Sequence, residues 1–336
     1  TRCHLIPTHE GLKMLQYIPF KDYKKGKYLY RLWNSEFKRT YPISAYLFKE
    51  RILNDINFDV NNSYVALYER MPIGFILIKK WQDDSLFYSI PHVATISLFY
   101  VEKDVRNMGV GTELLSLAMD GLKKDPNIKA LQLGNDLLSL FPGLPNEFNK
   151  TTPFLINRGF KSKDGCVDMI QIIHKNHKDL SSSIQTPKEL HTRIATEEDK
   201  DLLLKLCLDN NLIKEAYLIK RYFENGGTGR RIVLGLIDNQ IIGFVRIYDK
   251  KRNITRVNFF LDRAVGSLSA MGIDKKYQEG QYAEKLCLEA MNYLILRGCK
   301  KIMIEKTKNT EFYKKLGFKA FKYYLGFEKE INKDVS

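Results

Sequence analysis

The residues whose types and spacing are best suited to chemistry form one loop, with the pattern R-x-x-G-x-G at Arg106, Gly109 and Gly111. An apolar strand is predicted before the loop, over residues 93–101, and a helix with apolar residues at helical spacing is predicted after it, over residues 109–123. Two glycines let the backbone approach a ligand without an intervening Cβ atom. Because the first N–H groups of a helix have no partner inside the helix, the loop is predicted to hold a pyrophosphate.

Two other phosphate-binding motifs are absent from this loop, namely the Rossmann pattern G-x-G-x-x-G and the P-loop pattern G-x-x-x-x-G-K-[ST]. The alternative interpretation is a glycine-rich turn between a strand and a helix that holds no ligand. The apolar strand before the loop, and the recurrence of the same unit later in the chain, favour a ligand-binding loop.

With this spacing the segment resembles the cofactor loop of the GNAT superfamily of acyl-CoA-dependent N-acyltransferases, whose hallmark is [QR]-x-x-G-x-[GA] after a strand with an apolar end. The resemblance implies that acetyl-CoA is the co-substrate and that backbone N–H groups of residues 107–112 hold its pyrophosphate. It also implies that the preceding strand contacts the acetyl carbonyl and the pantetheine arm, and that the arginine has a supporting role. The cofactor-binding residues expected on this basis are Phe99, Val101, Arg106, Asn107, Met108, Gly109, Val110, Gly111 and Thr112.

The same order of predicted elements occurs twice: a hairpin, a strand, a long helix, a strand, a short helix and a strand. Val101 matches Ile273 and Arg106 matches Gln278, each 172 positions later, which is about half the chain and indicates a duplicated domain. The predicted elements are 63–68, 73–78, 93–101, 109–123, 128–133, 148–157 and 167–173 in the first half, and 231–237, 240–247, 267–273, 284–296, 301–305, 310–316 and 322–327 in the second.

The length of 336 residues exceeds the size at which a single core usually stops growing, so two domains are expected. Hairpins mixed with helices predict an α/β fold of the α+β mixed-sheet type. We expect two tandem GNAT-like domains, each a mostly antiparallel mixed sheet flanked by helices. The expected boundaries are 1–176 for the domain with the intact loop, 177–190 for a polar linker, and 191–336 for the domain with a degenerate loop.

The second half departs from the loop pattern but carries a candidate acid. Gln281 stands where the central glycine is expected, and a side chain there would crowd a bound phosphate. The segment 312–318 resembles the closing motif of the family, in which Tyr313 matches a tyrosine that protonates the departing thiolate. A ring packed in the core is the alternative for Tyr313. The first half has Leu155 at this position.

In the first half, Asp136 follows a predicted strand and is expected to reach the cleft, with a loop or helix-capping role as the alternative. Thr95 and Ser97 lie on the cleft strand, but hydroxyl groups are poor bases. The candidate catalytic residues are therefore Asp136 and Tyr313. His174 and His177 have no evident third ligand nearby, so no metal site is predicted.

The composition is that of a globular protein, with 44% hydrophobic and 28% charged residues. The net charge of +15 arises from scattered Lys and Arg, without a nucleic-acid reader motif, and no apolar run approaches the roughly 18 residues that span a bilayer. We therefore expect neither nucleic acid nor membrane as a partner. The five cysteines are never spaced as C-x-x-C and residues 1–5 lack a signal-peptide core, so a cytoplasmic location is expected. No pattern indicates an oligomeric state.

The expected acceptor is a small-molecule amine. The segment F-P-G-L-P at residues 141–145 is similar to a loop in a GNAT subgroup associated with amino-sugar metabolism, which favours glucosamine or another amino sugar. A rigid turn that only shapes the cleft is the alternative. Two other hypotheses remain: an acetyltransferase of peptides, proteins or other small amines with its chemistry at Tyr313 and Glu305 in the second half, or a non-catalytic acyl-CoA sensor.

Overall fold

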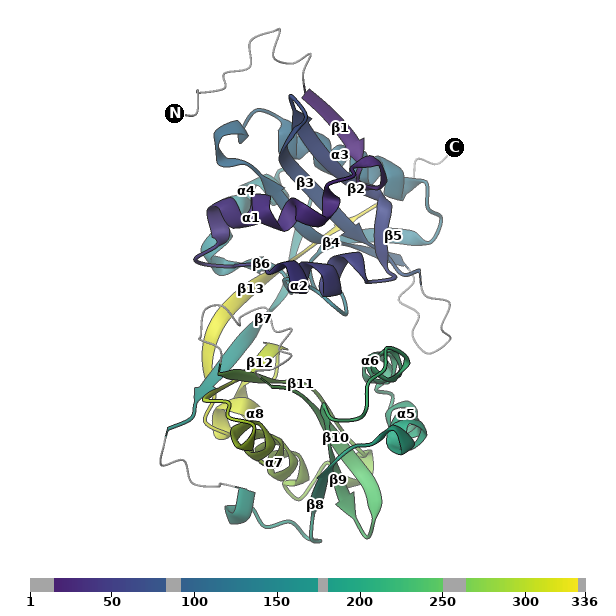
Figure 1. Cartoon of the computed structure of the whole chain (residues 1–336), viewed down its shortest axis with the longest axis vertical. Coiled ribbons are helices and arrows are strands. Elements are labelled where there is room, and N and C mark those ends of the chain that lie inside the picture. The colour runs from purple at the N-terminus through teal and green to yellow at the C-terminus, as the bar shows by residue number, and fades with distance from the viewer. Residues whose placement is uncertain (1–14, 83–91, 175–180, 250–263, 332–336) are drawn as a thin grey trace. The chain divides into compact units, whose positions relative to one another are not determined.

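The structure of the chain is a computed structural model that describes residues 15–82, 92–174, 181–249 and 264–331 (Figure 1). The described residues form two compact units. Unit 1 contains residues 15–82, 92–166 and 324–331, and unit 2 contains residues 167–174, 181–249 and 264–323. Residues 177–180 of the expected linker lie outside the described residues, and the expected domain boundaries stay a prediction.

Unit 1 contains the predicted first set of elements, preceded by a strand and two helices. The strands of its sheet follow the order β1-β2-β3-β4-β5-β13, and they are antiparallel except for the parallel pair β4–β5. Its elements are β1 (Leu15–Pro19), α1 (Leu29–Phe37), α2 (Ala45–Phe48), β2 (Phe58–Tyr68), β3 (Met71–Lys79), β4 (His92–Val101), α3 (Val110–Lys123), β5 (Ile128–Leu133), β6 (Leu144–Pro145), α4 (Thr152–Ile156) and parts of β7 (Lys161–Ile172) and β13 (Lys319–Glu330).

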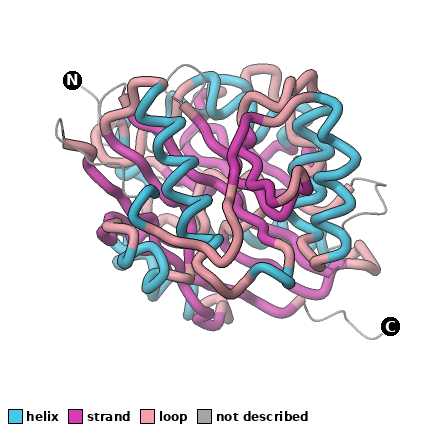
Figure 2. The backbone as a smooth tube through the Cα atoms, turned by 90° about the horizontal axis from the view of Figure 1, so that it is seen from below, coloured by secondary structure: helices cyan, strands magenta, loops and turns pink. Residues whose placement is uncertain are grey.

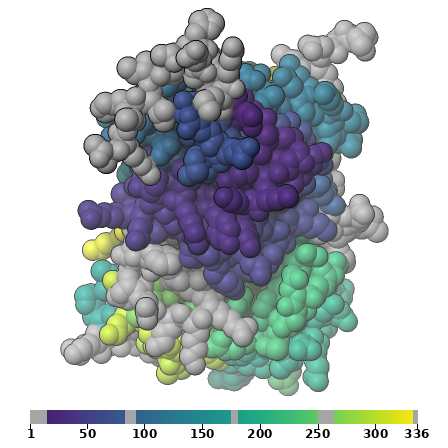
Figure 3. Space-filling view, turned by 45° about the horizontal axis from the view of Figure 1, so that its top comes forward, coloured from purple at the N-terminus to yellow at the C-terminus, as the bar shows by residue number. Residues whose placement is uncertain are grey.

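Both faces of the unit 1 sheet are covered by helices. Phe75 and Ile76 are neighbours on β3, so their fully buried side chains point to opposite faces. Ile76 packs with Leu114 of α3 in one hydrophobic cluster. On the other face the ring of Tyr100 lies 6.0 Å from those of Phe75 and of Trp33 in α1. The first elements of the chain, drawn in purple, form much of the surface of unit 1 seen in Figure 3.

Unit 2 contains the predicted second set of elements, again preceded by a strand and two helices. Its strand order is β7-β12-β11-β10-β9-β8, and β11–β12 is the parallel pair. Its elements are parts of β7 and β13, together with β8 (His191–Ile194), α5 (Lys200–Asp209), α6 (Ile213–Glu224), β9 (Ile232–Ile237), β10 (Gln240–Tyr248), β11 (Val265–Ile273), α7 (Tyr282–Leu296), β12 (Lys301–Thr307) and α8 (Thr310–Lys315).

The unit 2 sheet is also covered on both faces. Val245 and Phe244, neighbours on β10, are buried and point to opposite faces. Val245 packs with Leu286 of α7, whereas Phe244 packs with Leu203 of α5 and Ile219 of α6. Figure 2 shows the helices, in cyan, flanking the strands, in magenta. The predicted mixed sheet flanked by helices, and its duplication, are confirmed.

The last strand of the chain completes the sheet of unit 1. Residues of β13 pair antiparallel with β5, with Glu328 opposite Gln132, and Phe327 is 4% exposed in the same core cluster as Ile96. On the other side of β13, Lys163 Nζ of β7 lies 2.9 Å from Glu328 Oε1. The final part of β7, residues 167–172, belongs to unit 2 and pairs with β12. The last strand of each repeat therefore belongs in part to the other unit.

We expect Phe327→Ala to lower the free energy of unfolding of unit 1 by about 3–5 kcal/mol, because it opens a cavity in a packed core. Both tryptophans of the chain, Trp33 and Trp81, belong to unit 1, so urea unfolding followed by tryptophan fluorescence reports on this unit. Tyr323→Ala is the matched control in the same strand, since Tyr323 is 54% exposed. Equal unfolding midpoints for the two variants would show that β13 adds no stability to unit 1.

Candidate active site

In unit 1 the parallel strands β4 and β5 separate next to a β-bulge. Strand β3 pairs Leu77 with Leu98 and then Ile78 with Ile96, which leaves Ser97 as the extra residue. The pairing of β4 with β5 ends at the same place, where Ile96 lies opposite Leu133 and β5 stops. In the part of the chain that the structure describes, the rest of β4, up to its end, therefore has one edge without a neighbouring strand.

Unit 2 repeats this arrangement at the same offset of 172 residues. Ser269 is the extra residue of the bulge between β10 and β11, and the last pair between β11 and β12 is Leu268 with Ile304. Beyond this pair β12 turns away, with Lys306 in the left-handed region at φ 46°. The backbone N–H of Lys306 donates a 2.8 Å hydrogen bond to the fully buried carboxylate of Asp168 in β7. The bulge and this bond hold the two strands apart.

Such a separation leaves backbone N–H and C=O groups available for a ligand. A strand that has lost its neighbour presents the same hydrogen-bonding groups that an added strand or an extended ligand would use. Bulges are frequent beside active sites because they redirect side chains and end strand pairing. The two separations are therefore the candidate sites for an extended ligand.

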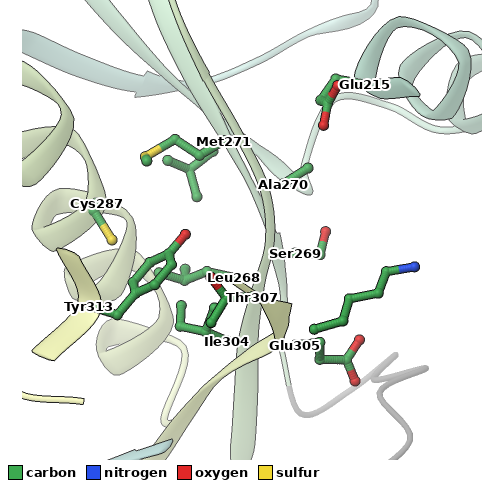
Figure 4. A pocket seen from close by; sticks show the side chains of 12 residues that line it. Glu215, Leu268, Ser269, Ala270, Met271, Cys287, Ile304, Glu305, Thr307 and Tyr313 are labelled. Atoms are coloured by element: carbon green, nitrogen blue, oxygen red, sulfur yellow. The ribbon is translucent and has the colours of Figure 1, made fainter. Parts of the chain in front are cut away.

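A cavity of about 210 Å³ lies at the separation in unit 2 (Figure 4). We call it the unit 2 cavity; the lining residues used below are Glu215, Ser269, Met271, Cys287, Glu305 and Tyr313. Figure 4 shows Tyr313, Cys287 and Met271 on one side of the strand that carries Ser269 and Ala270, with Glu215 on the other side. Three helices, α6, α7 and α8, thus supply side chains to one space between two strands.

Tyr313 presents its hydroxyl group to the unit 2 cavity while its ring is packed. The ring centroids of Phe312 and Phe318 lie 5.0 and 5.9 Å from that of Tyr313. Burial, reinforced by Cys287, raises the pKa of the phenol above its ordinary value of 10.0, so the group stays protonated at neutral pH. Among the described residues the hydroxyl has no hydrogen-bond partner. Tyr313 can therefore donate a proton to a group bound in the cavity.

Cys287 and Glu215 were not predicted as site residues. Burial raises the pKa of the Cys287 thiol to about 12, with a smaller contribution from Glu284, so this thiol stays protonated and is a poor nucleophile. Glu215 comes from α6, in a part of the chain that matches no motif. Its only sequence signal is its position near the start of an amphipathic helix, which gives no indication of a site.

The predicted cofactor loop of unit 1 has a backbone suited to an anion. Gly109 is the N-cap of α3 at φ 85°, and a Cβ atom added there would meet nothing within 4 Å. Asn107 is also left-handed, at φ 65°. The first helical hydrogen bond runs from the N–H of Glu113 to the carbonyl of Gly109, at 3.0 Å. The N–H groups of residues 110–112 therefore have no partner inside the helix, which is the arrangement that suits a phosphate.

Side chains of this loop brace it against its surroundings. Arg106 Nε donates to the carbonyl of Val101 at 2.9 Å, and its guanidinium forms a two-point ion pair with Glu36 of α1. Thr112 accepts a hydrogen bond from Arg158, whose guanidinium lies 3.8 Å from the ring centroid of Phe154.

The remaining predicted cofactor residues fall on both sides of the loop. The Phe99 ring centroid lies 5.8 Å from that of Phe154, and the Met108 side chain is 40% exposed. Val110 is buried in the core cluster of α3, and Gly111 would place a Cβ atom 3.4 Å from Val101 Cγ2. Thus the predicted residues are brought together around the end of β4 and the start of α3.

The corresponding loop of unit 2 also enters its helix through left-handed residues, although Gly280 matches Met108 and not the left-handed Asn107 of unit 1. Gln281 is the N-cap of α7 in the left-handed conformation, at φ 61°, and Gly280 before it has φ 81°. The N–H of Lys285 donates to the Gln281 carbonyl at 3.0 Å, as the matching bond does in unit 1. A non-glycine residue in this conformation costs roughly 1–2 kcal/mol. The exposed Gln281 side chain shows that the loop accommodates it at the surface.

Asp136 lies at the separation of β4 and β5, within a buried ion-pair group. Lys79 Nζ is 2.8 Å from Asp136 Oδ1 and 2.9 Å from Asp55 Oδ2, and the Lys79 side chain is 2% exposed. Ser97 donates to Asp136 at 3.2 Å, and Gln132 donates to Thr95 at 3.0 Å. Burial by itself lowers the pKa of Lys79, but the two carboxylates outweigh it and the pKa is raised. This geometry gives Asp136 a structural task, and its catalytic role stays a prediction.

The F-P-G-L-P segment is packed inside unit 1. Residues Phe141 to Pro145 are all buried, and Leu144 and Pro145 pair with Leu325 and Tyr324 of β13. A Cβ atom on Gly143 would lie 2.4 Å from the carbonyl oxygen of Leu325, so only glycine fits there. The segment thus forms a tight turn against the last strand.

No helix among the described residues is long and apolar enough to cross a membrane. Within the same described ranges, no three His, Cys, Asp or Glu side chains are grouped as ligands of a metal ion.

We expect Lys79→Met to lower the free energy of unfolding of unit 1 by about 3–5 kcal/mol, because two buried carboxylates lose their shared cation. Lys80→Met is the control: Lys80 lies 2.7 Å from Asp125 and 3.6 Å from Asp59, but its side chain is 21% exposed, so a smaller loss than in Lys79→Met is expected. Urea unfolding followed by tryptophan fluorescence measures both variants. A loss in Lys79→Met no larger than that in Lys80→Met would contradict the structural importance of the buried group.

Comparison with solved structures shows the fold. The chain is similar to a structure described as a GCN5-related glucosamine N-acetyltransferase region of a fungal multi-domain β-N-acetylglucosaminidase. The two chains are 14% identical with a TM-score of 0.79, and the match covers 94% of this chain and 38% of that chain. It therefore spans less than half the length of that protein.

Two further structures match the chain over nearly their whole length. A tandem GNAT protein from the clavulanic acid biosynthesis pathway has 14% identity and a TM-score of 0.64, with 95% of this chain and 99% of that chain covered. A GCN5-related N-acetyltransferase from Sphaerobacter thermophilus has 12% identity and a TM-score of 0.66, with 96% and 98% covered. No curated protein matches the chain in sequence.

The family model described as the acetyltransferase (GNAT) family matches residues 27–138 and again residues 198–318. These two ranges together cover more than half of the chain, and each contains one separated strand pair with its loop and helix. The chain therefore belongs to the GNAT family of acetyltransferases and carries two GNAT domains in tandem.

Proposed function

We propose that the protein transfers the acetyl group of acetyl-CoA directly to a primary amine, and that the transfer takes place in the unit 2 cavity. The observation that carries the proposal is the protonated hydroxyl of Tyr313, which faces a cavity between two separated strands. Unit 1 has Leu155 at the matching position, with a side chain that is 1% exposed and carries no proton to donate.

The reaction requires one bond to form and one to break. The amine nitrogen attacks the thioester carbonyl carbon, the carbon–sulfur bond breaks, and the departing thiolate takes the proton of the Tyr313 hydroxyl. The tyrosinate regains a proton from the nitrogen of the product. Backbone N–H groups of β11 beyond Leu268, which have no partner in β12, are placed to stabilise the charge on the carbonyl oxygen.

Backbone groups at the starts of α3 and α7 are proposed to hold the pyrophosphate of the co-substrate. In unit 1 these groups belong to residues 107–112, and in unit 2 they belong to residues 280–284. Both loops combine left-handed residues with unpaired N–H groups at a helix start, which supports an anion site in each unit. The net charge of +15 favours the approach of such a polyanion.

The proposed acceptor is a small-molecule primary amine, with glucosamine as the first candidate. The glucosamine N-acetyltransferase description of one structural neighbour supports it. Asp136 of unit 1 is paired with Lys79 and takes no part in a transfer in the unit 2 cavity. Free-thiol release from acetyl-CoA with glucosamine, an aminoglycoside, spermidine and a lysine peptide tests the acceptor class.

We expect Tyr313→Phe to lower kcat by about 100-fold or more, because general acid catalysis contributes roughly 10²–10⁴-fold. Since the hydroxyl has no partner among the described residues and the ring stays packed, the melting temperature should change little. Because the pKa of Tyr313 is raised, the loss should persist from pH 7 to about 10, where the wild-type phenol is protonated. Tyr323→Phe, at an exposed position, is the control. A Tyr313→Phe variant with wild-type kcat would remove Tyr313 from the mechanism.

We expect Gln281→Val to lower kcat/KM for acetyl-CoA about tenfold, because a β-branched residue resists a positive φ by roughly 1–2 kcal/mol. Gln281→Gly relieves the strain and should bind the co-substrate at least as well as the wild type. Gly109→Val is the matched change in unit 1, and its loss of kcat/KM is expected to be smaller. A larger loss in Gly109→Val than in Gln281→Val would place the transfer in unit 1.

A further inference from the structure

We propose that Glu215 of α6 binds the ammonium group of the acceptor and takes its first proton, so that the acceptor is an amine that carries a positive charge at neutral pH. This inference rests on the proposed function, because it assigns the second substrate of the same cavity. The proposal places the acceptor on the α6 side of the sheet, and Tyr313 lies on the opposite side.

The unit 2 cavity connects the two faces of the sheet. Tyr313 and Cys287 come from α8 and α7, which cover the face with Val245, whereas Glu215 comes from α6, which covers the opposite face with Phe244. Figure 4 shows Glu215 and Tyr313 on opposite sides of β11. With Tyr313 placed to protonate the sulfur on one side of β11, the Glu215 carboxylate is placed to meet the amine on the other side.

Glu215 is a half-buried carboxylate at the edge of the unit 2 cavity. Among the described residues it forms no hydrogen bond or ion pair, although it lines the unit 2 cavity. Glu224 on the same helix differs, since its Oε1 lies 2.5 Å from Lys220 Nζ. A carboxylate that is partly removed from water is stabilised by a cation placed beside it. The acceptor ammonium supplies that cation.

Charged and titratable groups from several elements lie around Glu215, and Glu215 is the carboxylate on the α6 side of the cavity. From α5, Cys207 is buried, and its burial together with the negative charge of Glu215 raises the pKa of the thiol to about 12, against the opposing effect of the buried Arg246 of β10. From β12, Glu305 and Lys306 line the same cavity with opposite charges, and both have interactions of their own. Glu215 is thus the carboxylate that the α6 side of the cavity offers to an entering ammonium.

The protons balance with this assignment. A protonated amine carries one proton more than the attacking nitrogen can retain, and Glu215 accepts it and returns it to solvent. The remaining excess proton of the nitrogen ends on the sulfur of the departing thiolate through Tyr313. The overall reaction consumes an ammonium and acetyl-CoA and releases an acetamide, a thiol and one proton.

The test compares Glu215→Gln with Glu224→Gln, which changes the paired carboxylate at the end of the same helix. At pH 7, Glu215→Gln should lower kcat/KM for the amine about 100-fold. The deficit should shrink as the pH rises above the pKa of the acceptor amine, because a neutral amine needs no proton acceptor. Glu224→Gln should match the wild type. A deficit that is equal at every pH, or one shared by Glu224→Gln, would overturn the inference.

A binding measurement separates this inference from the proposed function. Isothermal titration of glucosamine and of spermidine into the CoA-saturated protein should show binding that is at least tenfold weaker in Glu215→Gln. Binding that depends on Glu215 without any thiol release would support the inference and overturn the proposed transfer. Thiol release that Glu215→Gln leaves unchanged, or amine binding that is absent or independent of Glu215, would overturn the inference alone.

Discussion

The separation of two parallel strands is the constraint on which the candidate site depends. If β11 and β12 stayed paired to their ends, their backbone groups would satisfy one another and no cavity would exist between them. The extra residue Ser269 ends the regular pairing, and the buried carboxylate of Asp168 holds the backbone of Lys306 in a left-handed turn. A fully buried carboxylate is costly unless it accepts hydrogen bonds, so this contact resists any return to regular pairing.

The two units use the same separation differently. In unit 1 the space beside Ser97 is occupied by Asp136, which is held by the buried cation Lys79. In unit 2 the space beside Ser269 remains a cavity that Tyr313 and Glu215 enter from opposite faces. The bulge and the end of the parallel pairing thus recur at equivalent places in the two units, whereas the side chains at these places differ. This is why the family match to both halves does not by itself assign the reaction to either.

Strands β7 and β13, which are divided between the two units, pair with strands whose edges would otherwise be open. Strand β5 would present an unpaired edge if β13 did not pair with it, and an open edge is prone to associate with other chains. Glycine allows β7 and β13 to approach each other closely, because a Cβ atom on Gly165 would lie 2.1 Å from the carbonyl oxygen of Tyr324. The stability of unit 1 therefore depends on residues far from it in sequence, and the order of repeats along the chain is not the order of compact units.

The sequence by itself determined the features that depend on local patterns. Alternating apolar residues and turn residues predicted the hairpins, and the spacing of Arg106, Gly109 and Gly111 predicted the turn from β4 into α3. The offset of 172 residues predicted the duplication, and the structure adds paired bulges at Ser97 and Ser269 with the same offset. These features involve neighbours in the chain, where side-chain type and backbone conformation are directly linked.

Only the tertiary structure decided the rest, because it depends on contacts between distant residues. Asp136 forms an ion pair with Lys79, which is 57 positions away in the sequence, and no local pattern predicts a buried cation. Glu215 reaches the unit 2 cavity because α6 packs against β11, which periodicity alone cannot show. Gln281 takes a left-handed conformation that its residue type disfavours, since the surrounding loop and helix fix its backbone. Packing over long separations, and not residue type, placed the groups that distinguish one unit from the other.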